Sequence, residues 1–237
     1  MLTLLLATRN AHKIEEIKAI LGHAFAYLSL KDFPKAPEVT EDAASFAGNA
    51  AKKAIALAKW ITEPNSSQQA TRHLGELNVL ADDSGLEVDA LHGAPGVHSA
   101  RFAALDTGLQ GNSSDALNRE KLLRLLRNVP ANQRTARFRC FLALTPAWVP
   151  EKQNASPVCY ADEFELATQL FEGACEGHIC FEPRGQGGFG YDPLFVPEGY
   201  EQTFAELGEK VKNPISHRGR ALGKLRQRLS GGLTQLS

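Results

Sequence analysis

Near its amino terminus the chain reads Leu2-Thr3-Leu4-Leu5-Leu6-Ala7-Thr8-Arg9-Asn10-Ala11-His12-Lys13, a short apolar run followed by polar residues. The apolar part predicts a buried strand. Beyond it, Ile14, Ile17 and Leu21 recur at spacings of three and four, which predicts an amphipathic helix. The polar residues between the two segments therefore form a strand-to-helix turn.

The rest of the chain repeats this change between strand and helix. Helices are predicted at 46–61 and 117–126, at a capping box formed by Thr203 and Glu206, and from about Ser216, with Gly231 as a stop signal beyond the last helix. Strands are predicted at 78–81, continued in extended form to Ala90, and at 135–144, 164–171 and 177–181. Because strands and helices alternate imperfectly, we expect an α/β fold with a mixed sheet and flanking helices.

Composition narrows the class of protein. The 237 residues carry a formal net charge of −1, so the chain lacks the basic field that binds nucleic acid without sequence preference. No run approaches the ~20 apolar residues that span a bilayer, and the opening run is not built like a signal peptide. We therefore expect a cytoplasmic protein with no nucleic-acid or membrane partner.

The same numbers indicate how the chain is organised. Its length favours a single domain, with irregular surface loops at 62–77 and 146–162. Its four cysteines form no CxxC pair, and we expect them to be free, buried thiols.

The turn from Thr8 to Lys13 is a candidate phosphate site. A helix start leaves backbone N–H groups and the positive end of the helix dipole facing outward. Thr8 and Asn10 add short hydrogen-bonding side chains, and Lys13 adds a positive charge. An ordinary helix cap with a solvated lysine is the alternative interpretation.

A pair of aspartates marks a candidate metal site. The segment Asp82-Asp83-Ser84-Gly85 follows an apolar strand, and we expect it at the open end of that strand. Strand alternation sends the two carboxylates to opposite faces, so only one can point into a given site. Glu41, which precedes the helix at 46–61, is a further carboxylate that can reach the same place. Such oxygens suit Mg²⁺, although two turn-forming aspartates would give the same pattern.

Two further segments combine glycine, aromatic and basic residues. Gly185-Gln186-Gly187-Gly188-Phe189-Gly190 satisfies G-x-G-x-x-G, but no helix is predicted after it, so it does not fit a dinucleotide fingerprint. We interpret it as a loop that presents Phe189 for stacking on a base; a long hairpin with one buried Phe is the alternative. The segment 212–220 gathers basic side chains at the entry to the last helix, where they oppose the helix dipole unless an anion or a keto-bearing base lies nearby. A solvated basic cap is the alternative there.

In this order, the segments resemble the inosine triphosphate pyrophosphatase family, the noncanonical purine NTP (dITP/XTP) pyrophosphatases. The matching pieces are Ala7-Thr8-Arg9-Asn10 with Lys13, Glu41 with Phe46, Asn49-Ala50 and Lys53-Ala54, Ala81-Asp82-Asp83-Ser84-Gly85-Leu86, Gly93-Ala94-Pro95-Gly96 with Ser99-Ala100-Arg101, Gly187 to Pro193, and Ser216-His217-Arg218-Gly219. Each motif alone is weak, and their fixed order is what makes the resemblance specific. Arg9 departs from the pattern, because many members have glycine there.

The resemblance implies an activity and a set of site residues. It implies hydrolysis of ITP, dITP and XTP to the monophosphate and pyrophosphate, with Mg²⁺ bound by Glu41 and Asp83 and a catalytic role for Asp83. The substrate-binding residues it implies are Thr8, Arg9, Asn10, Ala11, His12, Lys13, Ser84, Phe189, Gly190, Tyr191, Asp192, Lys212, His217 and Arg218. It also implies a homodimer and an elongated mixed sheet with two lobes and the active cleft between them.

Several alternatives stay open at this point. The effective base can be Asp83 or a water molecule on the ion, because a carboxylate bound to a metal is a poor base. A pyrophosphatase for modified pyrimidine or methylated nucleotides is the nearest rival enzyme. A nucleotide-sensing module without turnover is the rival outside enzymes, and the presence of both Glu41 and Asp83 argues against it.

Overall fold

The computed structural model describes residues 2–63, 76–108, 111–147 and 162–233. Its strands are β1 (Thr3–Leu6), β2 (Ala26–Ser29), β3 (Leu77–Val88), β4 (Thr135–Pro146), β5 (Gln169–Ile179) and β6 (Phe195–Pro197). Its α-helices are α1 (Ala11–Leu21), α2 (Phe46–Thr62), α4 (Asp115–Leu125), α5 (Glu163–Ala167), α6 (Phe204–Leu207), α7 (Glu209–Ile215) and α8 (His217–Leu233). Residues 64–75 and 148–161, most of the two predicted surface loops, lie outside the described residues, as does Cys159.

The strands form one mixed sheet, as the sequence predicts. Their order is β2-β1-β3-β4-β5-β6. Strand β1 pairs in parallel with β2 and with β3, whereas β5 pairs with β6 in antiparallel fashion. The α/β prediction with a mixed sheet is therefore confirmed. No helix in the part of the chain that the structure describes has the length and apolar character needed to cross a bilayer.

The chain divides into two compact units. Unit 1 comprises residues 1–83 and 141–171, and unit 2 comprises residues 84–140 and 172–237. The long strands β3, β4 and β5 each contribute residues to both units. The boundary in β3 falls between Asp83 and Ser84, inside one of the sequence motifs.

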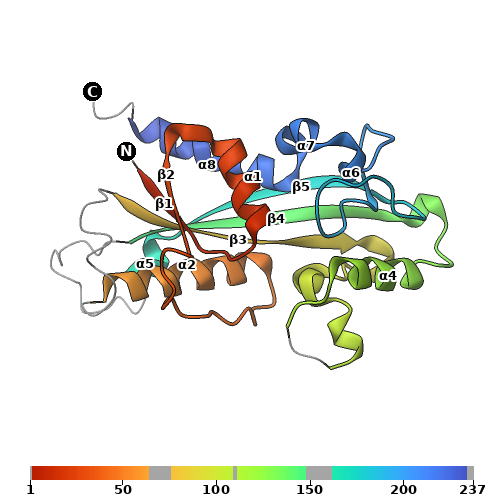
Figure 1. Cartoon of the computed structure of the whole chain (residues 1–237), viewed down its shortest axis with the longest axis horizontal. Helices are drawn as coiled ribbons and strands as arrows, with labels where there is room; N and C mark the ends of the chain where they lie inside the picture. The colour runs from red at the N-terminus through yellow and green to blue at the C-terminus, as the bar shows by residue number, and fades with distance from the viewer. Residues whose placement is uncertain (1, 64–75, 109–110, 148–161, 234–237) are drawn as a thin grey trace. The chain divides into compact units, whose positions relative to one another are not determined.

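Unit 1 buries one face of its strands against α2. Its apolar core combines Leu5 and Ala7 with Val79, Ala81 and the buried face of α2. Helix α1 lies on the other side of these strands and buries Ile17 and Leu21 (Figure 1). Successive residues of β3 therefore face different helices.

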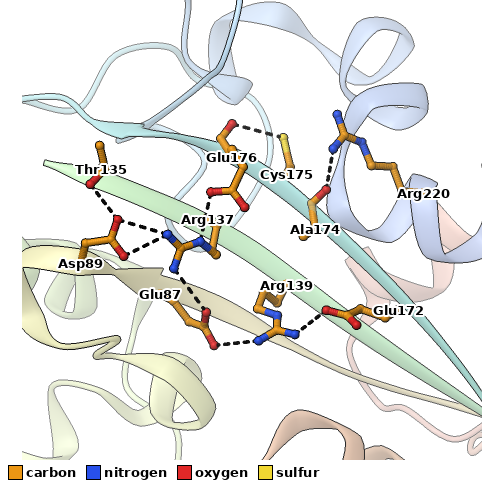
Figure 2. A network of polar contacts seen from close by, with 10 residues as sticks. All are labelled: Glu87, Asp89, Thr135, Arg137, Arg139, Glu172, Ala174, Cys175, Glu176 and Arg220. Atoms are coloured by element: carbon orange, nitrogen blue, oxygen red, sulfur yellow. Dashed lines mark hydrogen bonds and ion pairs between the residues drawn. The ribbon is translucent and has the colours of Figure 1, made fainter.

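Unit 2 has a separate apolar core and a polar sheet face. The core joins α4, α6 and the strands through residues such as Leu86, Leu122, Phe138, Phe195 and Phe204. On another face, acidic side chains of β3 and β5 and the residue after β3 surround arginines of β4 (Figure 2). The face bearing Ala136, Phe138, Cys140 and Leu142 is buried, as the alternation in the sequence predicts.

Four element predictions are wrong. Strand β3 runs unbroken through Asp82–Gly85, so the aspartates lie inside a strand and not at its open end. The predicted strand at 164–171 begins as helix α5, because Asp162 Oδ1 accepts a hydrogen bond from Phe164 N and caps a helical turn. The predicted strands at 164–171 and 177–181 are otherwise one strand, β5. Gly231 does not stop α8, which continues to Leu233.

Candidate active site

In unit 1, the turn after β1 caps α1. Asn10 Oδ1 accepts a hydrogen bond from Lys13 N at 3.2 Å, and Thr8 Oγ1 accepts one from Asn10 N at 3.2 Å. The residues from Arg9 to His12 are exposed, and the first turn carries no acidic side chain. Lys13 is not solvated, since its ammonium group pairs with the buried carboxylate of Asp82.

The two adjacent aspartates point to opposite faces of β3, as alternation predicts. Asp82 pairs with Lys13 of α1 on one face, and Asp83 lies 3.7 Å from Lys53 Nζ of α2 on the other. Both aspartates are buried, at 2% and 6% exposure. A lysine from each flanking helix therefore compensates the charges that would otherwise be costly inside a strand.

Lys53 brings the predicted metal ligands together. Its Nζ donates to Glu41 Oε1 at 2.7 Å and to the Asp82 carbonyl oxygen at 2.8 Å. Glu41 and Asp83 thus flank one ammonium nitrogen although they are far apart in sequence. Asn49, one turn earlier on α2, accepts a hydrogen bond from Ala43 N at 2.9 Å and anchors the loop that carries Glu41.

Asp83 is set apart by its electrostatics. Burial raises the pKa of its carboxyl above the usual range, while the ammonium groups of Lys53 and Lys13 act in the opposite direction. Its Oδ2 is buried, and no donor among the described residues bonds to it. An oxygen in this condition fits a hard cation such as Mg²⁺. No group of three or more His, Cys, Asp or Glu side chains suited to a metal occurs among the described residues.

In unit 2, the residues predicted around the nucleoside form a second cluster. Arg218 Nη2 donates to Ser84 Oγ at 2.9 Å, and Lys212 Nζ donates to Asp192 Oδ2 at 2.7 Å. The ring of His217 stacks on Phe138 with centroids 4.7 Å apart. Lys212, His217 and Arg218 are all buried, so the alternative of a solvated basic cap holds only for Arg220, which is exposed.

The segment 185–190, named the glycine loop below, ends beside these cations. It belongs to the connection between the antiparallel strands β5 and β6, so the hairpin alternative is correct in topology. Phe189 is only half buried, and its ring centroid lies 5.1 Å from Lys212 Nζ and 5.8 Å from Arg218 Cζ. No helix follows the loop directly, which confirms that the glycine pattern is not a dinucleotide fingerprint.

Asp192 and Tyr191 have structural contacts in addition to their predicted role. Asp192 Oδ2 accepts a hydrogen bond from Phe189 N at 2.9 Å. Tyr191 packs in the core of unit 2, and its hydroxyl donates to the Ser99 carbonyl oxygen at 3.0 Å. Burial raises the pKa of that hydroxyl well above its usual range. The substrate contact predicted for Tyr191 stays a prediction.

Sequence reasoning noted Lys53 only as a nearby charge and did not single out Asp115 or Arg119. Gly190 N donates to Asp115 Oδ2 at 2.6 Å, and Arg119 Nη1 donates to the Gly190 carbonyl oxygen at 2.7 Å. These partners lie 75 and 71 positions apart, so no local pattern marks them. Arg119 lies on the helix predicted at 117–126, but Asp115 precedes that predicted helix and joins it only in the structure, so their spacing of four was not visible as a helical pair.

Comparison with known proteins links the chain to one family. Residues 4–228 match the profile of the Ham1 family. A dITP/XTP pyrophosphatase of Desulforamulus reducens is 46% identical, with 93% of this chain and 92% of that protein aligned. A solved Ham1 protein from Coxiella burnetii is 34% identical, with a TM-score of 0.73 over 98% of this chain and all of the other. A dITP/XTP pyrophosphatase structure from Mycobacterium abscessus is 37% identical, with a TM-score of 0.62 over 94% of this chain and 98% of the other.

Proposed function

Because this chain belongs to the Ham1 family, we propose that it hydrolyses noncanonical purine nucleoside triphosphates such as ITP, dITP and XTP to the monophosphate and pyrophosphate. Relatives named dITP/XTP pyrophosphatase align over nearly the whole chain. One observation carries the proposal to this chain's own residues. The carboxylates of Glu41 and Asp83 both lie within 3.7 Å of the same ammonium nitrogen, that of Lys53.

Glu41 and Asp83 are the residues that would hold Mg²⁺. Oxygen ligands from one or two carboxylates, with water and substrate phosphates in the remaining positions, are the usual protein sites for this ion. When bound, the ion neutralises triphosphate charge and stabilises the departing pyrophosphate. The buried Asp83 Oδ2, which no donor bonds among the described residues, supports this assignment.

The residues of unit 1 act on the phosphates. The amino-terminal turn of α1 binds phosphate oxygens through its backbone N–H groups, with Thr8 and Asn10 beside them. Asp83 orients a water molecule toward the α-phosphorus. The water oxygen forms a bond to phosphorus and gives a proton to the Asp83 carboxylate, while the bond between phosphorus and the bridging oxygen breaks and pyrophosphate leaves. Lys13 and Lys53 provide positive charge for the phosphates.

The residues of unit 2 act on the nucleoside. Phe189 stacks on the purine, and Arg218 donates to the 6-oxo oxygen of hypoxanthine or xanthine. The Ser84 hydroxyl, which accepts from Arg218 at 2.9 Å, orients the guanidinium group. Adenine presents an amino donor at that position, and a buried mismatch of this kind discriminates by about 10⁴-fold.

The direct test is pyrophosphate release from ITP, XTP, dITP, GTP, ATP and dUTP, with and without Mg²⁺. We expect Mg²⁺-dependent turnover of ITP, dITP and XTP, with little turnover of ATP or dUTP. Asp83→Asn is expected to lower kcat by about three orders of magnitude, whereas Asp42→Asn, an exposed carboxylate beside Glu41, serves as the control with parent activity. An Asp83→Asn variant with more than about a tenth of the parent rate would remove Asp83 from the mechanism.

Base selectivity needs its own variant. Arg218→Ala is expected to narrow the ratio of ITP to ATP hydrolysis, because the donor to the 6-oxo oxygen is lost. An unchanged ratio would exclude Arg218 as the selecting residue. Measuring the ratio, and not the absolute rate, separates selectivity from any loss of stability caused by removing a buried guanidinium group.

We further propose that the protein is a homodimer, as the family resemblance implies, and that it acts in the cytoplasm, as expected from the sequence. Sedimentation equilibrium tests the first part, with a mass twice the 25.7 kDa of one chain as the expected result. A mass of one chain at micromolar concentration would contradict it.

A further inference from the structure

Gly190, the last residue of the glycine loop, is held by both of its backbone polar groups. Its N–H donates to Asp115 Oδ2 at 2.6 Å, and its carbonyl oxygen accepts from Arg119 Nη1 at 2.7 Å. Both side chains come from the amino-terminal half of α4. Gly190 has φ of +61°, a left-handed conformation that glycine adopts readily and leaves as readily. The two contacts therefore restrain a residue that has no side chain to restrain it.

Helix α4 is a firm support for these contacts. Asp115 and Arg119 are four residues apart and share a face of the helix. Between them, the buried Asn118 accepts from Ala103 N at 2.8 Å and donates to the Ala100 carbonyl oxygen at 3.2 Å. Lys121 Nζ donates to the Phe102 carbonyl oxygen at 2.7 Å. These bonds fix the helix in unit 2 independently of the glycine loop.

Asp192 holds the preceding residue of the loop from another direction. Its carboxylate accepts from Phe189 N at 2.9 Å and from Lys212 Nζ at 2.7 Å. Phe189 is thus fixed by Asp192 at its own amide and by α4 at the next residue. Its ring is half buried and lies beside Lys212 and Arg218.

We propose that Asp115 and Arg119 are positioning residues for nucleoside recognition, which hold Gly190 so that the Phe189 ring is already oriented for the base. This inference rests on the proposed function, since it deepens the role of Phe189 in unit 2. Neither residue touches the substrate. Restraining the loop before binding lowers the ordering cost that a flexible loop would add on association.

The kinetic test compares Asp115→Ala and Arg119→Ala with the parent. We expect KM for ITP to rise by about tenfold in each variant while kcat stays within about twofold, because the loop must be ordered on binding. Asp115→Asn keeps an acceptor oxygen and is expected to restore most of the affinity. Arg124→Ala, which removes an exposed arginine of α4 that pairs with Asp106, is the matched control with parent KM. A parent KM in both alanine variants would overturn the proposal.

A second measurement does not depend on turnover. Amide hydrogen exchange of residues 185–192 is expected to speed up by at least about tenfold in Asp115→Ala and Arg119→Ala but not in Arg124→Ala. Unchanged exchange at Gly190 would overturn the proposal even if KM rises. If the parent does not hydrolyse ITP at all, the proposed function fails, while the exchange experiment still decides whether α4 restrains the loop.

Discussion

At the scale of single residues, Lys53 is the centre of the acidic cluster in unit 1. Its ammonium group contacts the carboxylates of Glu41 and Asp83 and the backbone carbonyl of Asp82. Its side chain is 12% exposed, so solvent screens these interactions only in part. It therefore keeps Asp83 more acidic than burial alone would allow.

Replacing Lys53 should change the pH dependence of the reaction. Burial raises the pKa of Asp83 and Lys53 lowers it, so Lys53→Met raises that pKa further. The acidic limb of kcat/KM, which reports groups of the free enzyme, is then expected to move to higher pH, with a loss of at least about 100-fold at neutral pH. Lys52→Met, which removes the neighbouring lysine paired with Asp42, should leave the profile in place. If the acidic limb of kcat/KM does not move in Lys53→Met, Lys53 does not set the pKa of Asp83.

The substitution Gly188→Ala tests how closely the glycine loop packs against Asp192. A Cβ at this position would lie 2.1 Å from Asp192 Oδ2, the atom that accepts from Phe189 N and Lys212. Gly188→Ala is therefore expected to lower kcat/KM for ITP by at least about tenfold. Gly199→Ala is the matched control, because Gly199 has a similar φ of +83° and open space at its Cβ. Both variants carry the left-handed strain of about 1–2 kcal/mol, so equal activity in the two would exclude the clash as the cause.

The aspartate pair shows where prediction from sequence ends at this scale. Strand alternation correctly sends Asp82 and Asp83 to opposite faces, because that follows from local geometry. The prediction of an open strand end is wrong because burial of two charges depends on Lys13 and Lys53, which reach the strand from helices far away in sequence. Asp115 and Arg119 were not predicted for the same reason, because their partner Gly190 is far away in sequence.

At the scale of elements, charged side chains cross three strands of unit 2 in a ladder (Figure 2). Arg137 of β4 donates to Asp89 at 2.9 Å and to Glu176 at 3.0 Å, and it lies 3.9 Å from Glu87. Arg139 pairs with Glu172 and lies 3.6 Å from Glu87. Since the two arginines separate four carboxylates, their loss would leave like charges facing one another across the strands.

Arg137→Met should destabilise the protein in a pH-dependent way. The Thr135 hydroxyl and Arg137 hold the pKa of Asp89 in the folded protein below its ordinary value of 3.8. These contacts therefore stabilise the fold fully above pH 3.8, and their contribution is lost as the pH falls through the lowered pKa of folded Asp89. We expect Tm to fall by about 2–4 °C at pH 7. The difference in Tm between the variant and the parent should disappear as the pH drops below 3.8 and in about 1 M salt. Arg127→Met, at an exposed loop arginine, is the control. A difference in Tm that persists at acidic pH would show that the variant is destabilised mainly by lost packing of the Arg137 side chain and not by lost ion pairs.

Elements with strong periodicity were predictable, and those defined by their partners were not. The helices at α1, α2, α4 and α8 follow from apolar spacing and caps, and the capping box of α6 is present. Strand β2 and helix α7 gave no clear pattern; β2 is only half buried, and α7 is short and contains Pro214. Two strands were predicted where β5 is one unbroken strand, in which Gly173 and Gly177 allow the close approach of α8 and β6.

At the scale of the whole molecule, the predicted site residues fall into both units. The turn proposed for phosphate binding, Glu41 and Asp83 belong to unit 1, and all the residues predicted around the nucleoside belong to unit 2. The order of motifs in the sequence indicated the family, but the periodicity of the elements did not indicate this division. The division falls inside one strand, where no loop or change of composition marks it.

This separation predicts that each unit recognises its own part of the nucleotide. Pyrophosphate with Mg²⁺, and IMP alone, should each raise Tm of the parent, since a ligand at about 100 times its Kd adds about 2.7 kcal/mol to the free energy of unfolding. Glu41→Gln is expected to abolish the shift with Mg²⁺ and pyrophosphate but keep the shift with IMP. Phe189→Ala should do the reverse, so that each variant is the control for the other. If both variants lose both Tm shifts equally, the assignment of phosphates to unit 1 and nucleoside to unit 2 is wrong, because each ligand would then depend on residues of both units.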